Sequence, residues 1–295
     1  AEPTDTLLPG MRIDGSLKLV SWRDTGNPAA GSFTFQQDQE SRLPKIMNGL
    51  RVVHWKSDQS GSVVLPYFVA FFLSNFSRSV NQATYKSSSA YPSINPGKGL
   101  RNPSTLNYSD ALASYANTRL LMNSSGQIQF YSLEQDGWSL TWSEPHDACS
   151  VYNPCGNFGS CNLRSEGLNC DCLPGFNPIF PDAWNTGDFS GGCDRKLAIC
   201  SKTSKPDTFL NLKLMKVGKP DILSAGADSE DTCRQECLRN CDCQAYYYAG
   251  FNGQEGTDNG GSGCLIWTSV LTNLQEEYID GGHNLSVRVA VSSIG

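Results

Sequence analysis

The twelve cysteines of this 295-residue chain are distributed very unevenly. The first is Cys149 and the last is Cys264, so the N-terminal half of the chain contains none. An even number of cysteines crowded into one part of a chain is typical of a disulfide framework, which forms in an oxidising compartment. The sequence therefore predicts a secreted or cell-surface protein whose C-terminal half consists of small disulfide-stabilised modules.

Other features of the sequence agree with exposure outside the cell. Four asparagines stand in the pattern that accepts N-linked glycans, namely Asn75, Asn107, Asn123 and Asn284. The formal net charge is −6 and no cluster of Lys or Arg stands out, which argues against nucleic acid and anionic membrane surfaces as partners. The chain opens without the basic and apolar segments of a signal peptide, so we expect a mature chain or a segment of a longer precursor.

Apolar alternation in the first 145 residues predicts a region of β-strands. One run places Trp138, Leu140 and Trp142 on the same predicted face, and residues 127–133 alternate in the same way. The sequence Asn-Ser-Ser-Gly at 123–126 predicts a hairpin turn. Further short strands are expected at 17–22, 32–38 and 50–56.

Two stretches of this region depart from simple alternation. The apolar run at residues 63–73 is too short to cross a bilayer, which takes about 20 residues, and we predict that it forms one or two buried strands. Residues 79–117 are rich in Ser, Asn, Pro and Gly, and they predict a long loop.

The last part of the chain is predicted to contain one helix, over residues 230–239. Asp228 or Ser229 is the expected N-cap, and Asn240 is the expected stop signal. Three cysteines recur every four residues and are therefore expected on one face of this helix: Cys233, Cys237 and Cys241. Strands are expected to follow at 243–251, 264–267 and 285–291.

Metal binding and catalysis are the alternatives to a disulfide framework. A structural zinc site needs Cys-x2-Cys pairs or comparable histidine spacings, whereas the close pairs here are Cys170 with Cys172 and Cys241 with Cys243. A cysteine nucleophile needs a free thiol and a histidine base, and no free thiol is expected among paired cysteines. The sequence Asp-Phe-Ser-Gly at 188–191 echoes a kinase metal-binding motif without its companion motifs. We therefore predict no metal, no cofactor and no catalytic residue.

Eight segments carry a recognisable pattern in a fixed order. They are PTDTLLPGM at 3–11, LVSWRDTGNPAAGSFTF at 19–35, TRLLMNSSGQIQFY at 118–131, WSEPHDACSVYNPCGNFGSCN at 142–162, CLPGF at 172–176, DFSGGCDRK at 188–196, CRQECLRNCDCQAYYY at 233–248 and CLIW at 264–267. Together they resemble the ectodomains of the plant G-type lectin S-receptor-like serine/threonine-protein kinases. That family includes the S-locus glycoproteins and the receptors of pollen self-incompatibility.

The resemblance implies a mainly β, multi-domain fold. It assigns residues 1–32 to the remnant of a bulb-type lectin domain, 33–145 to the S-locus-glycoprotein domain, 146–194 to an EGF-like module and 195–295 to a PAN/apple module. The second of these is expected to be a lectin-like β-prism, the third a disulfide-rich module and the fourth a small α+β module. The mannose-pocket pattern of bulb-type lectins is absent, so no mannose site is implied.

The resemblance also implies how the cysteines pair. The EGF-like module is expected to contain Cys149–Cys161, Cys155–Cys170 and Cys172–Cys193. The PAN/apple module is expected to contain Cys233–Cys264 and Cys237–Cys243, which by arithmetic leaves Cys200–Cys241. A lone Asp147 precedes Cys149, so no calcium site is implied.

The function implied by the resemblance is extracellular recognition without catalysis by this chain itself. The chain is expected on the outer face of the plasma membrane, as part of a receptor-like kinase that serves pollen recognition, immunity or development. Its expected partners are an extracellular ligand (a peptide, glycan or lipid) or a partner receptor in a homo- or heterodimer. Ligand specificity is expected between about residues 67 and 117, and receptor contact on the C-terminal module. The alternative is a secreted S-locus-type glycoprotein without a kinase.

Overall fold

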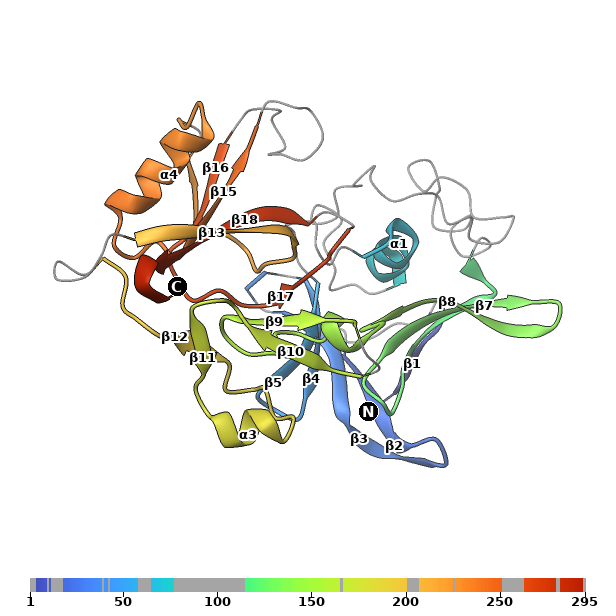
Figure 1. The fold of residues 1–295 in the computed structure, drawn as a ribbon. Coiled ribbons are helices and arrows are strands. Elements are labelled where there is room, and N and C mark those ends of the chain that lie inside the picture. Colours follow the sequence, from blue (N-terminus) through green and yellow to red (C-terminus); the bar gives the residue numbers. More distant parts are fainter. Residues whose placement is uncertain are drawn as a thin grey trace. The chain divides into compact units, whose positions relative to one another are not determined.

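The computed structural model shows a chain built mainly of β-strands in several sheets (Figure 1). It describes residues 4–9, 11, 18–38, 40–41, 43–57, 65–76, 115–164, 167–200, 207–224, 226–250, 263–279 and 282–293. Two compact units make up the chain: unit 1 is Ala1–Gln59 with Val63–Tyr152, and unit 2 is Ser60–Ser62 with Asn153–Gly295. The predicted mainly β, multi-sheet class is confirmed.

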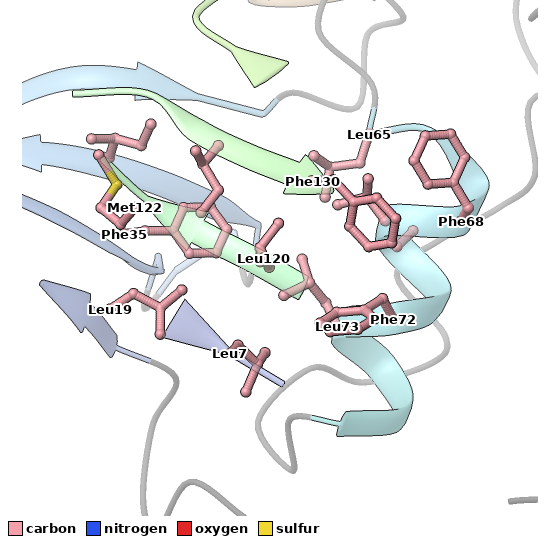
Figure 2. Close-up of a cluster of buried hydrophobic side chains, with 14 of the residues drawn as sticks. Leu7, Leu19, Phe35, Leu65, Phe68, Phe72, Leu73, Leu120, Met122 and Phe130 are labelled. Atoms are coloured by element: carbon pink, nitrogen blue, oxygen red, sulfur yellow. The ribbon is translucent and has the colours of Figure 1, made fainter. Parts of the chain in front are cut away.

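Unit 1 contains two four-stranded antiparallel sheets. One has the order β2-β3-β4-β5, with the bounds Lys18–Asp24, Asn27–Gln37, Pro44–Asn48 and Val52–Lys56. The other has the order β1-β6-β7-β8, with the bounds Thr6–Leu7, Thr118–Met122, Ile128–Glu134 and Gly137–Glu144. The inward faces of both sheets supply one core, in which Leu19, Phe35, Leu120 and Phe130 are fully buried (Figure 2).

The predicted turn at 123–126 joins β6 to β7. The Asn123 backbone N–H donates to the Gln127 carbonyl at 2.9 Å, and Met122 pairs with Ile128. Gly126 has φ +92°, and a Cβ there would lie 2.8 Å from His54 Nε2, so the turn requires glycine both for its backbone conformation and for its close packing.

The prediction of buried strands at 63–73 is wrong, because the apolar run forms the helix α1, Tyr67–Phe76. The Pro66 carbonyl accepts the first helical bonds, from the Val69 and Ala70 N–H groups. Phe68, Phe72 and Leu73 point from α1 toward the sheets (Figure 2), and the Phe72 and Phe130 rings meet edge to face at 5.4 Å. A short apolar run does not distinguish a buried strand from a buried helix by periodicity alone.

The prediction that Trp138, Leu140 and Trp142 share a face is also wrong. A register shift at Phe130 and Tyr131 pairs Phe130 with Trp142 but Tyr131 with Leu140. The extra residue of such a bulge reverses the alternation of side chains along the strand. As a result Trp142 packs against the core, whereas Trp138 and Leu140 are exposed.

Unit 2 begins with short elements, most of them in the cysteine-rich segment, residues 149–193 (Figure 1). The 3-10 turn η3, Ala148–Ser150, precedes them at the end of unit 1. The strands are β9 to β12, with the bounds Gly159–Asn162, Asn169–Cys172, Phe176–Pro178 and Cys193–Arg195. The short helix α3, Pro181–Asn185, lies between β11 and β12.

The rest of unit 2 is a five-stranded sheet with one long helix against it. The sheet order is β13-β18-β15-β16-β14, with the bounds Asp207–Met215, His283–Ala290, Ala245–Ala249, Gly263–Trp267 and Ile222–Ser224. The two-residue strand β17, Leu274–Gln275, joins β9, and the 3-10 turn η4, Val291–Ser293, follows β18.

The predicted helix is α4, Glu230–Arg239 (Figure 1). Its N-cap is Ser229, whose side chain accepts from the Thr232 N–H, and Asn240 ends it in an extended conformation. Cys233 and Cys237 are buried on the inner face of α4, as predicted. Cys241 does not share that face, because the helix has already ended, and it is exposed.

Candidate functional site

Disulfide bonds stabilise two consecutive parts of unit 2, the cysteine-rich segment and the five-stranded module. In the cysteine-rich segment the structure joins Cys155 to Cys170 and Cys172 to Cys193. In the five-stranded module the pairs are Cys200–Cys241, Cys233–Cys264 and Cys237–Cys243. These are the same partners that the family resemblance implies. Cys149 and Cys161 are also disulfide-bonded, and no cysteine is free to act as a nucleophile or a metal ligand.

The two pieces share one hydrophobic core. The cysteine-rich segment contributes Phe158, Leu173 and Phe176, and the five-stranded module contributes residues such as Trp267 and Leu285. The cysteine-rich segment has only short strands and buries little apolar surface by itself. Its disulfides and the core that it shares with the five-stranded module therefore both stabilise it.

Backbone hydrogen bonds reinforce this shared core. Strand β17 pairs in parallel with β9, placing Leu274 beside Ser160. The Phe158 N–H donates to the Leu271 carbonyl at 2.9 Å, and the Glu276 N–H donates to the Cys161 carbonyl at 2.9 Å. The cysteine-rich segment and the five-stranded module are therefore joined by a common core and by backbone hydrogen bonds. Neither the composition nor the cysteine spacing indicated this connection.

Arg288 is the most heavily bonded charged residue of this interior. Its guanidinium, which is buried, forms an ion pair of 2.8 Å with the buried carboxylate of Asp207. It also donates to the carbonyls of Cys237 and Asn240, at 3.1 and 2.8 Å, at the C-terminal end of α4. Each carbonyl also accepts one backbone N–H, from Asn240 and Cys243 respectively, so Arg288 adds a second donor and links the end of α4 to β18. The only sequence signal for this role is one arginine in an apolar strand.

Arg195 joins β12 to the five-stranded module. It donates to the Arg288 carbonyl and, at 2.9 Å, to Gln244 Oε1. Its guanidinium lies over the Phe176 ring, 4.7 Å from the centroid. Burial lowers the pKa of Arg195 to about 10, which still leaves it charged at neutral pH.

A histidine between two carboxylates lies at the end of unit 1. His146 Nδ1 is 3.0 Å from Glu144 Oε1, and Nε2 is 3.3 Å from Asp147 Oδ2. The hydrogen bond to Asp147, followed by that to Glu144, raises the pKa of His146 to about 10. The same contact with His146 lowers the pKa of Asp147. His146 is therefore a cation at neutral pH and cannot serve as a general base there.

The glycan acceptors differ in their surroundings. Asn284, at the start of β18, is exposed. Asn123 is half-buried in its turn, where Oδ1 accepts from the Ser125 N–H, the Ser125 hydroxyl and the Gln127 N–H. Asn107 and the side chain of Asn75 lie outside the described residues, as do residues 79–114 of the loop predicted at 79–117.

Neither a metal centre nor a membrane span is visible in the part of the chain that the structure describes. No group of three or more metal-ligating side chains occurs among those residues. None of the helices described is long and apolar enough to cross a bilayer. Asp188, in the kinase-like sequence, accepts from the N–H and hydroxyl of Ser190, an arrangement typical of a turn.

Comparison with known proteins adds to this architecture. The model of the S-locus glycoprotein domain matches residues 74–180, and that of the PAN-like domain matches residues 200–274. A G-type lectin S-receptor-like serine/threonine-protein kinase of Arabidopsis thaliana is 43% identical over 300 residues, 99% of this chain and 32% of the relative. A receptor-like serine/threonine-protein kinase of the same plant is 32% identical over 310 residues, with the same two coverages. The chain spans about a third of the length of these curated relatives.

Proposed function

Because the chain carries the S-locus glycoprotein and PAN-like domains and corresponds to the ectodomain portion of the plant G-type lectin S-receptor-like kinases, we propose that it is the extracellular recognition region of a receptor-like kinase. Its role is to bind a ligand or partner receptor outside the cell. Phosphoryl transfer belongs to another segment of the parent protein. The likeness over 99% of the chain is the observation that carries this proposal.

The disulfides support an extracellular location. All twelve cysteines are paired, and thiols in the cytosol are kept reduced. Exposure of Asn284 fits the same location, because its side chain can carry a glycan without disturbing the fold.

The interval from residue 67 to 117, expected to hold ligand specificity, divides into two parts. Phe68, Val69, Phe72 and Leu73 of α1 are core residues, so these four side chains support the scaffold and are not available for ligand contact. We propose that specificity resides after α1, in a stretch outside the described residues. Replacing residues 80–114 with the shorter equivalent of a relative would test this, and unchanged ligand affinity would contradict it.

The experiment that tests the proposed function is ligand capture by the folded chain. The secreted chain would be incubated with plant extracellular fluid, repurified and analysed for retained molecules, with the reduced and alkylated chain as control. We expect a molecule that binds only the folded chain and saturates at one site by calorimetry. Absence of any saturable binding would contradict recognition as the function.

A separate measurement distinguishes the membrane receptor from a secreted glycoprotein. The transcript would be sequenced beyond the codon of Gly295. A receptor kinase predicts an apolar stretch of about 20 residues followed by kinase motifs. A stop codon without them would favour the secreted S-locus-type glycoprotein.

A further inference from the structure

One disulfide of the five-stranded module is more exposed than any other in the chain. The structure describes all twelve cysteines, and nine of them are buried. Cys172 is half-buried, but its partner Cys193 is buried. Cys200 is half-buried and Cys241 is exposed, so the bond between them is the only one without a buried cysteine.

Cys241 lies in a short turn that follows α4. The turn is closed by the Cys243 N–H, which donates to the Asn240 carbonyl at 3.0 Å. Asp242, the next residue after Cys241, is exposed as well. A thiolate must reach a sulfur atom in order to break a disulfide, so access controls the rate of exchange, and exposed disulfides are the labile ones. A reagent can therefore attack Cys241 while the module stays folded.

Other contacts hold the parts of the module when this disulfide opens. Strand β13 pairs with β18 throughout its length. Helix α4 keeps its two buried disulfides, one to β16 and one to Cys243. Arg288 still joins the carboxylate of Asp207 to the carbonyl of Asn240. The open form is therefore expected to remain folded.

The bond restrains the linker between β12 and β13. In the part of the linker that the structure describes, the Lys196 N–H donates to the Gly175 carbonyl at 2.9 Å and the Cys200 N–H to Asp207 Oδ2 at 2.8 Å. Cys200 also has φ +57°, a conformation that residues other than glycine rarely adopt. Because the bond to Cys241 ties this residue to the end of α4, opening it removes one restraint on an unfavourable conformation.

We propose that Cys200–Cys241 is a reversible thiol–disulfide exchange site for an extracellular dithiol, such as a thioredoxin-like protein. The thiolate of the reductant attacks Cys241 Sγ, the S–S bond breaks, and Cys200 leaves as a thiolate that takes a proton from water. The second thiol of the reductant loses its proton to water and attacks the mixed disulfide, which releases Cys241. Two electrons pass from the dithiol to the cysteine pair, and the reductant becomes a disulfide. Exchange with a small disulfide runs the same steps in reverse and closes the bond.

Differential alkylation of the whole secreted chain tests the proposal, which does not depend on the proposed recognition function. The native chain would be incubated with increasing concentrations of dithiothreitol, quenched with iodoacetamide at set times and mapped by peptide mass spectrometry. We expect Cys200 and Cys241 to be alkylated together, at least about tenfold faster than any other pair, with Cys172–Cys193 as the reference. The near-ultraviolet circular dichroism of this partly reduced chain should stay native.

The controls separate access from intrinsic sulfur reactivity. In concentrated urea the folded structure no longer shields any disulfide, so the difference in rate should disappear. In the double variant Cys200→Ser with Cys241→Ser the rapid phase should be absent, and the remaining pairs should keep their rates. After the reductant is removed, glutathione disulfide should close the opened bond of the wild-type chain between the same two cysteines.

Four results would overturn the proposal. They are another pair that opens first or equally fast, loss of native dichroism as Cys200–Cys241 opens, a difference in rate that persists in urea, and thiols that do not form the same bond again. If the double variant does not fold, mapping of the wild-type chain still decides between these outcomes and the expected one.

Discussion

Asn153 and Asn273 are 120 residues apart in the chain and exchange two reciprocal hydrogen bonds. The backbone N–H of each donates to the side-chain Oδ1 of the other, at 3.1 and 2.7 Å. Both residues have positive φ, 48° and 58°, a conformation in which asparagine is tolerated better than most residues. The pair closes the start of unit 2 onto the segment that leads into β17.

Replacing Asn273 should therefore destabilise unit 2 in two separable ways. Asn273→Gly keeps the positive φ but leaves the Asn153 N–H without its acceptor, and we expect a loss of about 1–3 kcal/mol. Asn273→Ala should cost a further 1–2 kcal/mol or so, because alanine is strained at this φ. Urea unfolding measures both, and equal stability of the two variants would argue against backbone strain.

The buried pair Arg288 and Asp207 predicts an asymmetric response to mutation. Arg288→Met leaves the Asp207 carboxylate buried without its cation and removes the side-chain donors at the end of α4, so we expect a loss of about 3–5 kcal/mol. The double variant with Asp207→Leu should lose less than the sum of the two single variants. Chemical denaturation of all four proteins completes the cycle, and simple additivity would show that the pair is not coupled.

The contact of His146 with two carboxylates predicts a dependence of stability on pH. The folded protein raises the pKa of His146 to about 10 from the ordinary 6.5, so the folded state binds the proton more tightly. Its contribution to stability is complete below pH 6.5 and is lost as the pH rises through 10. Urea midpoints between pH 6 and 10 measure this loss. In His146→Gln the slope over that range should flatten, and an unchanged slope would assign it to other groups.

The two described glycan acceptors should respond differently to substitution. Asn284→Gln removes an exposed glycan acceptor and should leave the melting temperature within about 1 °C of the wild type. Asn123→Gln removes the short acceptor that holds three donors in the turn, and should cost about 1–2 kcal/mol. Asn123→Asp also abolishes the acceptor pattern but keeps Oδ1, so it is the matched control. Mass spectrometry before and after glycosidase treatment reports occupancy.

Local sequence signals predicted local structure well. The N-cap at Ser229 and the stop at Asn240 bracket α4, and the turn at 123–126 follows from its glycine. Local signals failed where burial against other elements determines the secondary structure of a segment. Tyr67–Phe76 is a helix because its apolar side chains reach the Phe130 ring on β7, and no local pattern shows that contact.

The parts of the candidate site that the sequence did not predict are long-range. Asn153 and Asn273 are ordinary turn residues when taken singly, and only the fold brings them together. The register shift at Phe130 and Tyr131 is likewise set by how β7 and β8 pair, so the exposure of Trp138 could not be read from alternation.

The shared core of unit 2 has a consequence for receptor engineering. Exchange of the cysteine-rich segment between relatives, cut at its sequence borders, would separate Phe158 and Phe176 from Trp267 and Leu285. The chimera would then have to match foreign side chains across a close-packed interior, where even one methylene too many or too few is destabilising. The smallest transplantable piece of this half of the chain therefore combines the whole cysteine-rich segment, from Cys149 on, with the five-stranded module.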